Sequence, residues 1–212
     1  MSMASDPKIE QPTHFAFTNE NLAKAQEVIA RYPAGHQASA VMPLLWMAQR
    51  QHNGWLPRVA MDVVADMLQM PRIRVYEVAS FYTMYNRKPV GENFIQVCRT
   101  TPCWLRGSDD ITNACKKRLG VGLGQTTADG KFSVVEVECL GACVNAPMVQ
   151  INDDYFEDLT PESMVSIIDA LARGEQPKVG TQVERQFSAP VGGATTLNGD
   201  VGRADNGASR GQ

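Results

Sequence analysis

Five cysteines are the residues of this sequence with the greatest capacity for chemistry. Four of them form two pairs: Cys98 and Cys103 enclose four residues, and Cys139 and Cys143 enclose three. Thiolates are soft ligands, and four of them on neighbouring loops select zinc or an iron-sulfur cluster over calcium or magnesium. No secretory signal opens the chain, so we expect a cytosolic, reducing setting, which argues against a scaffold of structural disulfides.

The spacing of the pairs differs from that of common zinc sites. Zinc ribbons usually carry C-x-x-C pairs that are about 15 to 20 residues apart, whereas both pairs are wider here and the gap between them is longer. Wider spacing suits a larger group, and a four-residue span within a pair recurs in plant-type [2Fe-2S] ferredoxins. Neither pair is the C-x-x-C of dithiol exchange enzymes. A structural zinc site and two disulfides stay open as alternatives at this point.

Two predicted strands position the two pairs. The apolar run Phe94 to Val97 leads into Cys98, and the alternating segment 131–138 ends at Cys139. Because each pair directly follows a strand, we expect both pairs on loops at the same edge of one sheet.

The elements around these strands predict a thioredoxin-like layer. A helix over 108–119 carries Cys115 on its apolar face, where a free cysteine packs as a small hydrophobe and not as a ligand. A hairpin over 148–157 and a helix over 161–174 follow. The resulting order of strand, helix, strand, strand, helix is typical of the thioredoxin-like layout.

The chain before the first pair is predicted to be helical. Apolar residues recur every three or four positions in four stretches that are interrupted by proline or glycine. The predicted helices cover residues 19–32, 39–53, 57–68 and 71–85. The aromatic residues of this part are interpreted mainly as bundle core, with partner docking as the alternative: Trp46, Trp55, Phe81, Tyr82 and Tyr85.

These patterns predict an α+β protein in four parts. A flexible arm at 1–18 precedes a helical bundle at 19–88 and a thioredoxin-like domain at 89–176. The Gly-rich segment 177–212 shows no apolar period, which predicts a flexible C-terminal tail.

The composition excludes several classes of function. The 212 residues carry a formal net charge of −3, so we expect no nucleic-acid partner. No apolar run approaches the roughly 20 residues of a membrane span. The glycine-dense segment 120–124 follows a predicted helix, the reverse of the strand-to-helix context of a dinucleotide-binding loop. We therefore expect neither a nicotinamide nor a flavin site on this chain.

Two segments that contain the cysteine pairs resemble a known family. VCRTTPCWLRG at 97–107 and VECLGACVNAPMVQIN at 137–152 are similar to the cluster loops of the thioredoxin-like [2Fe-2S] subunits of respiratory complex I, the NADH:quinone oxidoreductase. Residues 39–57 and 80–86 resemble the helical N-terminal domain of the same family. The resemblance implies that four cysteines ligate one [2Fe-2S] cluster: Cys98, Cys103, Cys139 and Cys143.

The resemblance also implies a role in electron transfer. The chain would be a non-catalytic subunit that exchanges single electrons with FMN on a partner flavoprotein subunit that binds NADH. It would belong to the peripheral arm of complex I, on the cytoplasmic face of a bacterial inner membrane or on the matrix side in mitochondria. The alternatives are the equivalent subunit of an NAD-linked formate dehydrogenase or hydrogenase, and a zinc-structured interaction module without redox activity.

Four residues near the cysteines are expected to tune such a cluster. Gly107 and Gly141 allow backbone N–H groups to approach sulfur without a side chain in the way. Arg99 and Arg106 flank the first loop, where positive charge would raise the reduction potential of a cluster; the alternative is that both side chains are only solvated. The resemblance implies a small residue at this position in many relatives, and Arg99 departs from that pattern.

Overall fold

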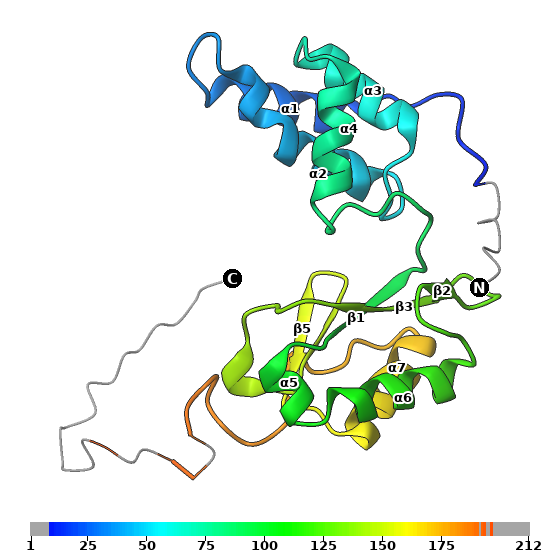
Figure 1. Ribbon diagram of the computed structural model, residues 1–212, viewed down its shortest axis with the longest axis vertical. Helices are drawn as coiled ribbons and strands as arrows, with labels where there is room; N and C mark the ends of the chain where they lie inside the picture. Colours follow the sequence, from blue (N-terminus) through cyan, green and yellow to red (C-terminus); the bar gives the residue numbers. More distant parts are fainter. Residues whose placement is uncertain (1–8, 191, 194–195, 197–212) are drawn as a thin grey trace. The chain divides into compact units, whose positions relative to one another are not determined.

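The computed structural model describes residues 9–190, 192–193 and 196 (Figure 1). Its backbone divides into two compact units, one of residues up to 93 together with 126–133, and one of 94–125 together with residues from 134 onward. The domain limits that the sequence suggests at 88 and 176 stay a prediction. None of the described helices combines the length and the apolar character that crossing a membrane requires.

The first unit is helical, as expected. Its helices are α1 (Asn19–Ala30), η1 (Gln37–Ala40), α2 (Val41–Gln51), α3 (Arg58–Met67) and α4 (Arg72–Phe81). Helix α1 begins where the Thr18 side chain accepts a hydrogen bond from the backbone N–H of Asn21. Helix α4 ends four residues earlier than the periodicity predicts, because Tyr82 adopts an extended backbone.

The aromatic residues of this unit divide between core and surface. Trp55 and Tyr85 are buried, and the Tyr85 hydroxyl donates to the carbonyl of Met42 at 2.9 Å. In contrast, Phe81 and Tyr82 are exposed. The interpretation as bundle core is therefore correct for the first two and wrong for the last two.

Residues 15–17 before α1 are packed, which differs from the flexible arm expected at 1–18. Phe15 and Phe17 are buried in the helical core, with their rings edge to face at 5.3 Å. The Gln51 amide donates to the carbonyl of Ala16 at 2.8 Å. Two aromatic side chains separated by one residue carry no helical period, so the pattern did not reveal their burial. Residues 1–8 lie outside the described part of the chain.

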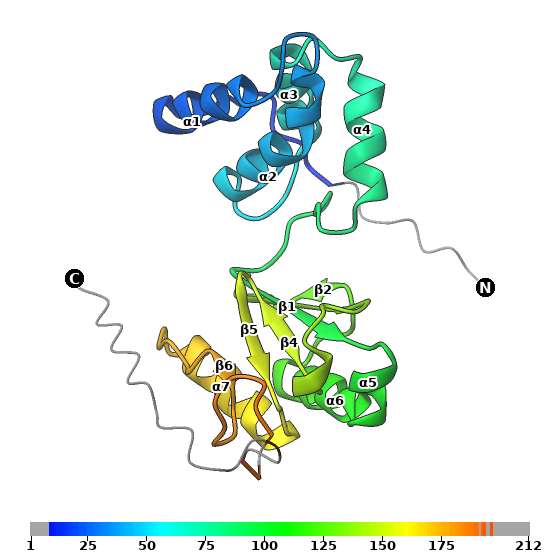
Figure 2. The ribbon, with the colours of Figure 1, turned by 90° about the vertical axis from the view of Figure 1, so that its left-hand side faces the viewer.

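A six-stranded sheet follows the helices, with its strands in the order β2-β3-β1-β4-β5-β6. The strands are β1 (Asn93–Cys98), β2 (Gln125–Thr126), β3 (Phe132–Val137), β4 (Val149–Ile151), β5 (Asp154–Glu157) and β6 (Gly180–Thr181). Strands β1 and β4 are antiparallel, with Val97 opposite Val149. Strands β4 and β5 form the predicted hairpin and lie side by side in Figure 2. The fully buried side chains of Ile95 and Val97 anchor β1.

Helices α6 (Ser108–Leu119) and α7 (Pro161–Ala172) lie together on one face of this sheet (Figure 1). A capping box of Thr160 and Ser163 begins α7, and Arg118 of α6 pairs with Asp169 of α7. The short helix α5 (Thr101–Leu105) precedes α6 and was not expected. The arrangement is the α+β, thioredoxin-like fold that the order of elements predicts.

The tail is ordered at its beginning, where the sequence predicts flexibility from 177 onward. Strand β6 pairs in parallel with β5, and residues 181–189 continue with hydrogen bonds to the sheet and to the loop at 143–145. The high glycine content of the segment 177–212 predicts flexibility throughout, so the sequence pattern does not indicate this short ordered stretch. Residues 191, 194–195 and 197–212 lie outside the described part of the chain.

Candidate metal centre

The strand order brings both cysteine loops to one place. Because β1 lies between β3 and β4, the chain from β3 to β4 must pass the end of β1, where Cys98 begins the first loop. The backbone N–H of Arg99 donates to the carbonyl of Val137 at 3.1 Å, and that of Cys98 donates to the carbonyl of Met148 at 3.3 Å. The first loop is thus bonded to the strand end before the second loop and to a residue that follows it.

The four thiols occupy two kinds of environment. Cys98 and Cys103 are both 1% exposed, whereas Cys139 is exposed and Cys143 is half-buried. The sulfurs of Cys139 and Cys143 lie 3.4 Å apart. The Cys98 thiol interacts with the thiols of both Cys103 and Cys139, which links the inner pair to the outer pair. Cys103 stands on α5 and not on an open loop, so this short helix fixes its position.

The inner pair combines one thiol of low pKa with one of high pKa. Burial raises the pKa of Cys98, but hydrogen bonds from Thr100, the Leu140 backbone and Cys103 bring it below the ordinary thiol value. Burial, together with the bond to Cys98, raises the pKa of Cys103 to about 12. Cys98 is therefore the thiol of this pair that loses its proton more readily. Cys103 would lose its proton only on binding a metal.

The outer pair repeats this asymmetry at the surface. The backbone N–H of Gly141 and the thiol of Cys143 lower the pKa of Cys139. The bond to Cys139 in turn raises the pKa of Cys143. Gly141 has φ +90°, a backbone conformation that favours glycine and directs its N–H toward sulfur, as expected. Gly107 instead forms the turn between α5 and α6, since its N–H donates to the Trp104 carbonyl at 3.0 Å.

The donor set fits a binuclear iron-sulfur cluster. Among the described residues, no group of three or more His, Cys, Asp or Glu side chains is placed closely enough to hold a metal ion. The thiols are grouped as two adjoining pairs, which is the donor set that two linked irons require when each iron takes two thiolates. Thiolate is also the ligand that iron-sulfur clusters prefer.

Two residues of the site were not found from the sequence. Tyr155 of β5 donates its hydroxyl to the carbonyl of Leu140 at 2.8 Å, which supports the second loop. Its pKa is raised by burial and then by the neighbouring thiolates of Cys98 and Cys139. Thr100 places its hydroxyl 3.5 Å from the sulfur of Cys98. Neither residue stands in a recognisable spacing, and only the strand order brings Tyr155 to the cysteines.

Of the two arginines near the first loop, Arg99 has an anionic partner. Arg99 lies 3.4 Å from a carboxylate oxygen of Glu136, and its side chain is more than half exposed. Glu136 also accepts a hydrogen bond from Thr112 at 3.4 Å. Arg106 is exposed. Glu136 thus partly neutralises the positive charge of Arg99, which reduces the effect of this charge on the cysteines.

The fifth cysteine stays apart from the other four. Cys115 is fully buried on α6, among the residues that this helix turns inward. Burial raises the pKa of its thiol to about 12. Its interpretation as a core residue agrees with this position.

Comparison with known proteins places these features in a family context. Residues 25–172 match the family model of the thioredoxin-like [2Fe-2S] ferredoxins. The chain is 62% identical over 159 residues to an NADH-quinone oxidoreductase subunit of Rickettsia bellii (strain RML369-C), covering 75% of this chain and 95% of that protein. It is 52% identical over 185 residues to the mitochondrial NADH dehydrogenase [ubiquinone] flavoprotein 2 of Dictyostelium discoideum, covering 87% of this chain and 75% of that protein.

The fold recurs in a solved structure of another enzyme. An NAD+-reducing [NiFe]-hydrogenase in the H2-reduced state matches 64% of this chain and 23% of its own chain, with a TM-score of 0.54. The two sequences are 22% identical over this region, so the likeness shows a shared fold.

Proposed function

Because this chain belongs to the thioredoxin-like [2Fe-2S] ferredoxin family, we propose that it is the electron-transfer subunit of an NADH:quinone oxidoreductase. The chain does not catalyse the overall reaction alone and acts as a subunit of that oxidoreductase complex. The relatives at 62% and 52% identity are named for an NADH-quinone oxidoreductase and an NADH dehydrogenase, which favours this complex over the hydrogenase at 22%.

The proposed cluster ligands are Cys98, Cys103, Cys139 and Cys143. The observation that carries this assignment is the meeting of two thiol pairs at the end of β1, with the sulfurs of the outer pair 3.4 Å apart. When bound there, a [2Fe-2S] cluster accepts and releases one electron at a time. Gly141 and Thr100 donate hydrogen bonds to cysteine sulfurs, which stabilises negative charge on them.

The proposed partner is the flavoprotein subunit that binds NADH and FMN. NADH delivers two electrons as a hydride, and a flavin is the group that accepts a hydride and returns single electrons. The sequence predicts no dinucleotide or flavin site on this chain, so the hydride chemistry belongs to a partner. The proposed location is the cytoplasmic face of a bacterial inner membrane, or the matrix side in mitochondria, where NADH is available.

Three exposed apolar side chains beside the cysteines support a docking surface for that flavoprotein. Trp104 is 57% exposed next to Cys103, Leu105 is 70% exposed, and Val144 is 70% exposed next to Cys143. An electron is exchanged only over a short distance, so the donor must cover the surface nearest the thiols. Apolar and aromatic side chains at that place are the residues that anchor protein interfaces.

Replacing Trp104 with aspartate is expected to weaken binding to the flavoprotein subunit about tenfold or more, because a charge replaces an interface anchor. Isothermal titration calorimetry measures the affinity between this chain with its cluster bound and the flavoprotein subunit with FMN bound. Leu123, which is 37% exposed on the loop before β2, provides the control, and Leu123→Asp should change the affinity less than about twofold. Equal effects of both substitutions would contradict a docking surface at the cysteine loops.

The redox role is tested with the assembled pair of subunits. The purified chain should contain two irons and two acid-labile sulfides per molecule, and NADH should produce the electron paramagnetic resonance signal of a reduced cluster when the flavoprotein is present. Zinc in a colourless protein would exclude a redox function. Reduction of flavin without any cluster signal would exclude electron exchange. Mass spectrometry of co-purifying chains tests the complex, and hydrogenase or formate dehydrogenase subunits would contradict complex I.

Replacing Arg99 with alanine is expected to lower the midpoint potential of the cluster by roughly 10 to 40 mV, which corresponds to the energy of an exposed ion pair. The substitution removes a positive charge and leaves Glu136 unbalanced, so adding an electron becomes less favourable. A potentiometric titration followed by visible absorbance measures the change. Arg173→Ala, which breaks an exposed pair with Glu175, is the control. An unchanged potential would show that Arg99 does not act on the cluster.

A further inference from the structure

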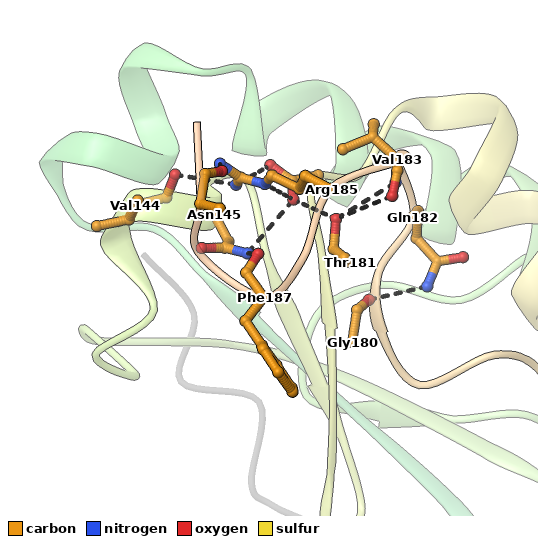
Figure 3. A network of polar contacts seen from close by, with 10 residues as sticks. Val144, Asn145, Gly180, Thr181, Gln182, Val183, Arg185 and Phe187 are labelled. Atoms are coloured by element: carbon orange, nitrogen blue, oxygen red, sulfur yellow. Dashed lines mark hydrogen bonds and ion pairs between the residues drawn. The ribbon is translucent and has the colours of Figure 1, made fainter. Parts of the chain in front are cut away.

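Residues 180–189 form a strap that joins the sheet to the second cysteine loop (Figure 3). The strap begins as β6, where Gly180 lies opposite Phe156 and Thr181 lies opposite Glu157. The backbone N–H of Gln182 then donates to the carbonyl of Glu157 at 3.0 Å. The start of the strap is therefore fixed by the sheet itself.

A buried ion pair holds the centre of the strap. Two nitrogens of Arg185 bind two oxygens of Asp158, with Nε–Oδ2 at 3.0 Å and Nη2–Oδ1 at 2.6 Å. The two side chains are only 6% and 12% exposed. Thr181 adds a hydrogen bond from its hydroxyl to the same carboxylate at 2.6 Å. A bidentate guanidinium–carboxylate pair has a fixed planar geometry, so it holds Arg185 in one orientation.

The same guanidinium contacts the second cysteine loop. Nη2 of Arg185 donates to the carbonyl of Val144 at 3.2 Å, and Val144 directly follows Cys143. The side-chain amide of the buried Asn145 donates to the carbonyl of Phe187 on the strap at 3.1 Å. The backbone N–H of Asp158 donates to the carbonyl of Asn145 at 2.8 Å. In Figure 3, dashed lines join the Arg185 side chain to the backbone of Val144 and the Asn145 side chain to the backbone of Phe187.

These contacts fix the residues next to one thiol of the outer pair. Cys143 itself is half-buried and stands at the first position of a three-residue 3-10 helix, which has little rigidity of its own. Partners behind a ligand orient it, and their loss commonly weakens metal binding. A segment 41 to 42 positions further along the chain thus contacts the two residues that follow Cys143.

We propose that the strap positions the outer cysteine pair and that Arg185 is the positioning residue through which it acts. This inference rests on the proposed function, since it assigns the strap to retention of the cluster held by Cys143. The strap is outside both cysteine loops, and its effect passes through the backbone of Val144 and the side chain of Asn145.

The test compares two arginines of the same geometry in the full-length, cluster-loaded protein. Arg173 also forms a bidentate pair, with Glu175, but both side chains are more than half exposed. Arg185→Gln should speed the loss of visible absorbance in excess EDTA about tenfold or more, whereas Arg173→Gln should change the rate less than about twofold. Arg185→Lys keeps the charge and loses the planar fork, so it should show an intermediate rate. It also provides the test if Arg185→Gln fails to fold.

A second measurement separates positioning from general stability. The electron paramagnetic resonance spectrum of the reduced cluster should change in Arg185→Lys, because the geometry around one iron is altered. Loss rates of both Arg185 variants within about twofold of the unaltered protein would overturn the proposal. Faster loss with an unchanged spectrum and a lowered melting temperature of the cluster-loaded protein would also overturn it. Absence of iron and sulfide from the unaltered protein would instead overturn the proposed function.

Discussion

Replacing Cys103 with alanine is expected to abolish stable binding of the cluster, while replacing Cys115 with alanine leaves it intact. Both thiols are buried, at 1% and 0% exposure, so the two substitutions remove a sulfur from similarly packed sites. Of these two residues, only Cys103 interacts with Cys98, and the charge of Cys143 contributes to raising the pKa of its thiol. Loss of one of four ligands leaves an iron without its fourth bond, and the cluster then dissociates.

The measurement is the iron and acid-labile sulfide content after anaerobic purification, together with visible absorbance. The Cys103→Ala protein should contain less than about a tenth of the iron of the unaltered protein, and Cys115→Ala should contain the same amount. Circular dichroism in the far ultraviolet checks that both variants are folded. Full iron content in Cys103→Ala, or its loss in Cys115→Ala, would show that the ligand assignment is wrong.

Replacing Gly91 with alanine is expected to destabilise the protein by about 3 kcal/mol. A Cβ atom at this position would lie 2.6 Å from the backbone carbonyl carbon of Phe132 and 2.8 Å from its nitrogen. Backbone atoms cannot move aside as a flexible side chain does, so strand β3 must shift. The substitution would also strain the bond in which the N–H of Gly91 donates to the Ser133 hydroxyl at 2.7 Å.

Chemical denaturation measures this effect as the change in the free energy of unfolding. Gly192→Ala is the matched control, because a Cβ atom there meets no heavy atom within 4 Å. We expect the control to change the stability by less than about 0.5 kcal/mol. A similarly small change for Gly91→Ala would mean that β3 tolerates displacement next to the start of β1.

The helices and strands were predictable where one periodic pattern covered a whole element. Helix α6 follows its predicted limits, because its apolar residues recur along one face and Gly120 ends it with φ +68°. Helix α5 was missed, since five residues are too few to show a period. Strand β6 was missed for the same reason, and the glycines around it predict flexibility.

The cysteine chemistry was predictable from residue type and spacing. Thiolates select soft metals wherever they meet, and the division of five cysteines into four plus one followed from the helical position of Cys115. These properties depend on the residues themselves and on neighbours a few positions away. The meeting of the two pairs required one further condition, that β1 and β3 run in the same direction, and the backbone bonds from Asn93 to Lys131 and from Arg99 to Val137 show that they do.

The surroundings of the cysteines were decided by the tertiary structure alone. Tyr155 supports the second loop, and Arg185 contacts it from 41 residues beyond Val144. No window of sequence reveals both partners of such a contact, because the chain folds back between them. By itself the sequence therefore determined which thiols are available and which chemistry they favour. The order of the strands and the docking of residues 180–189 decided how those thiols are held.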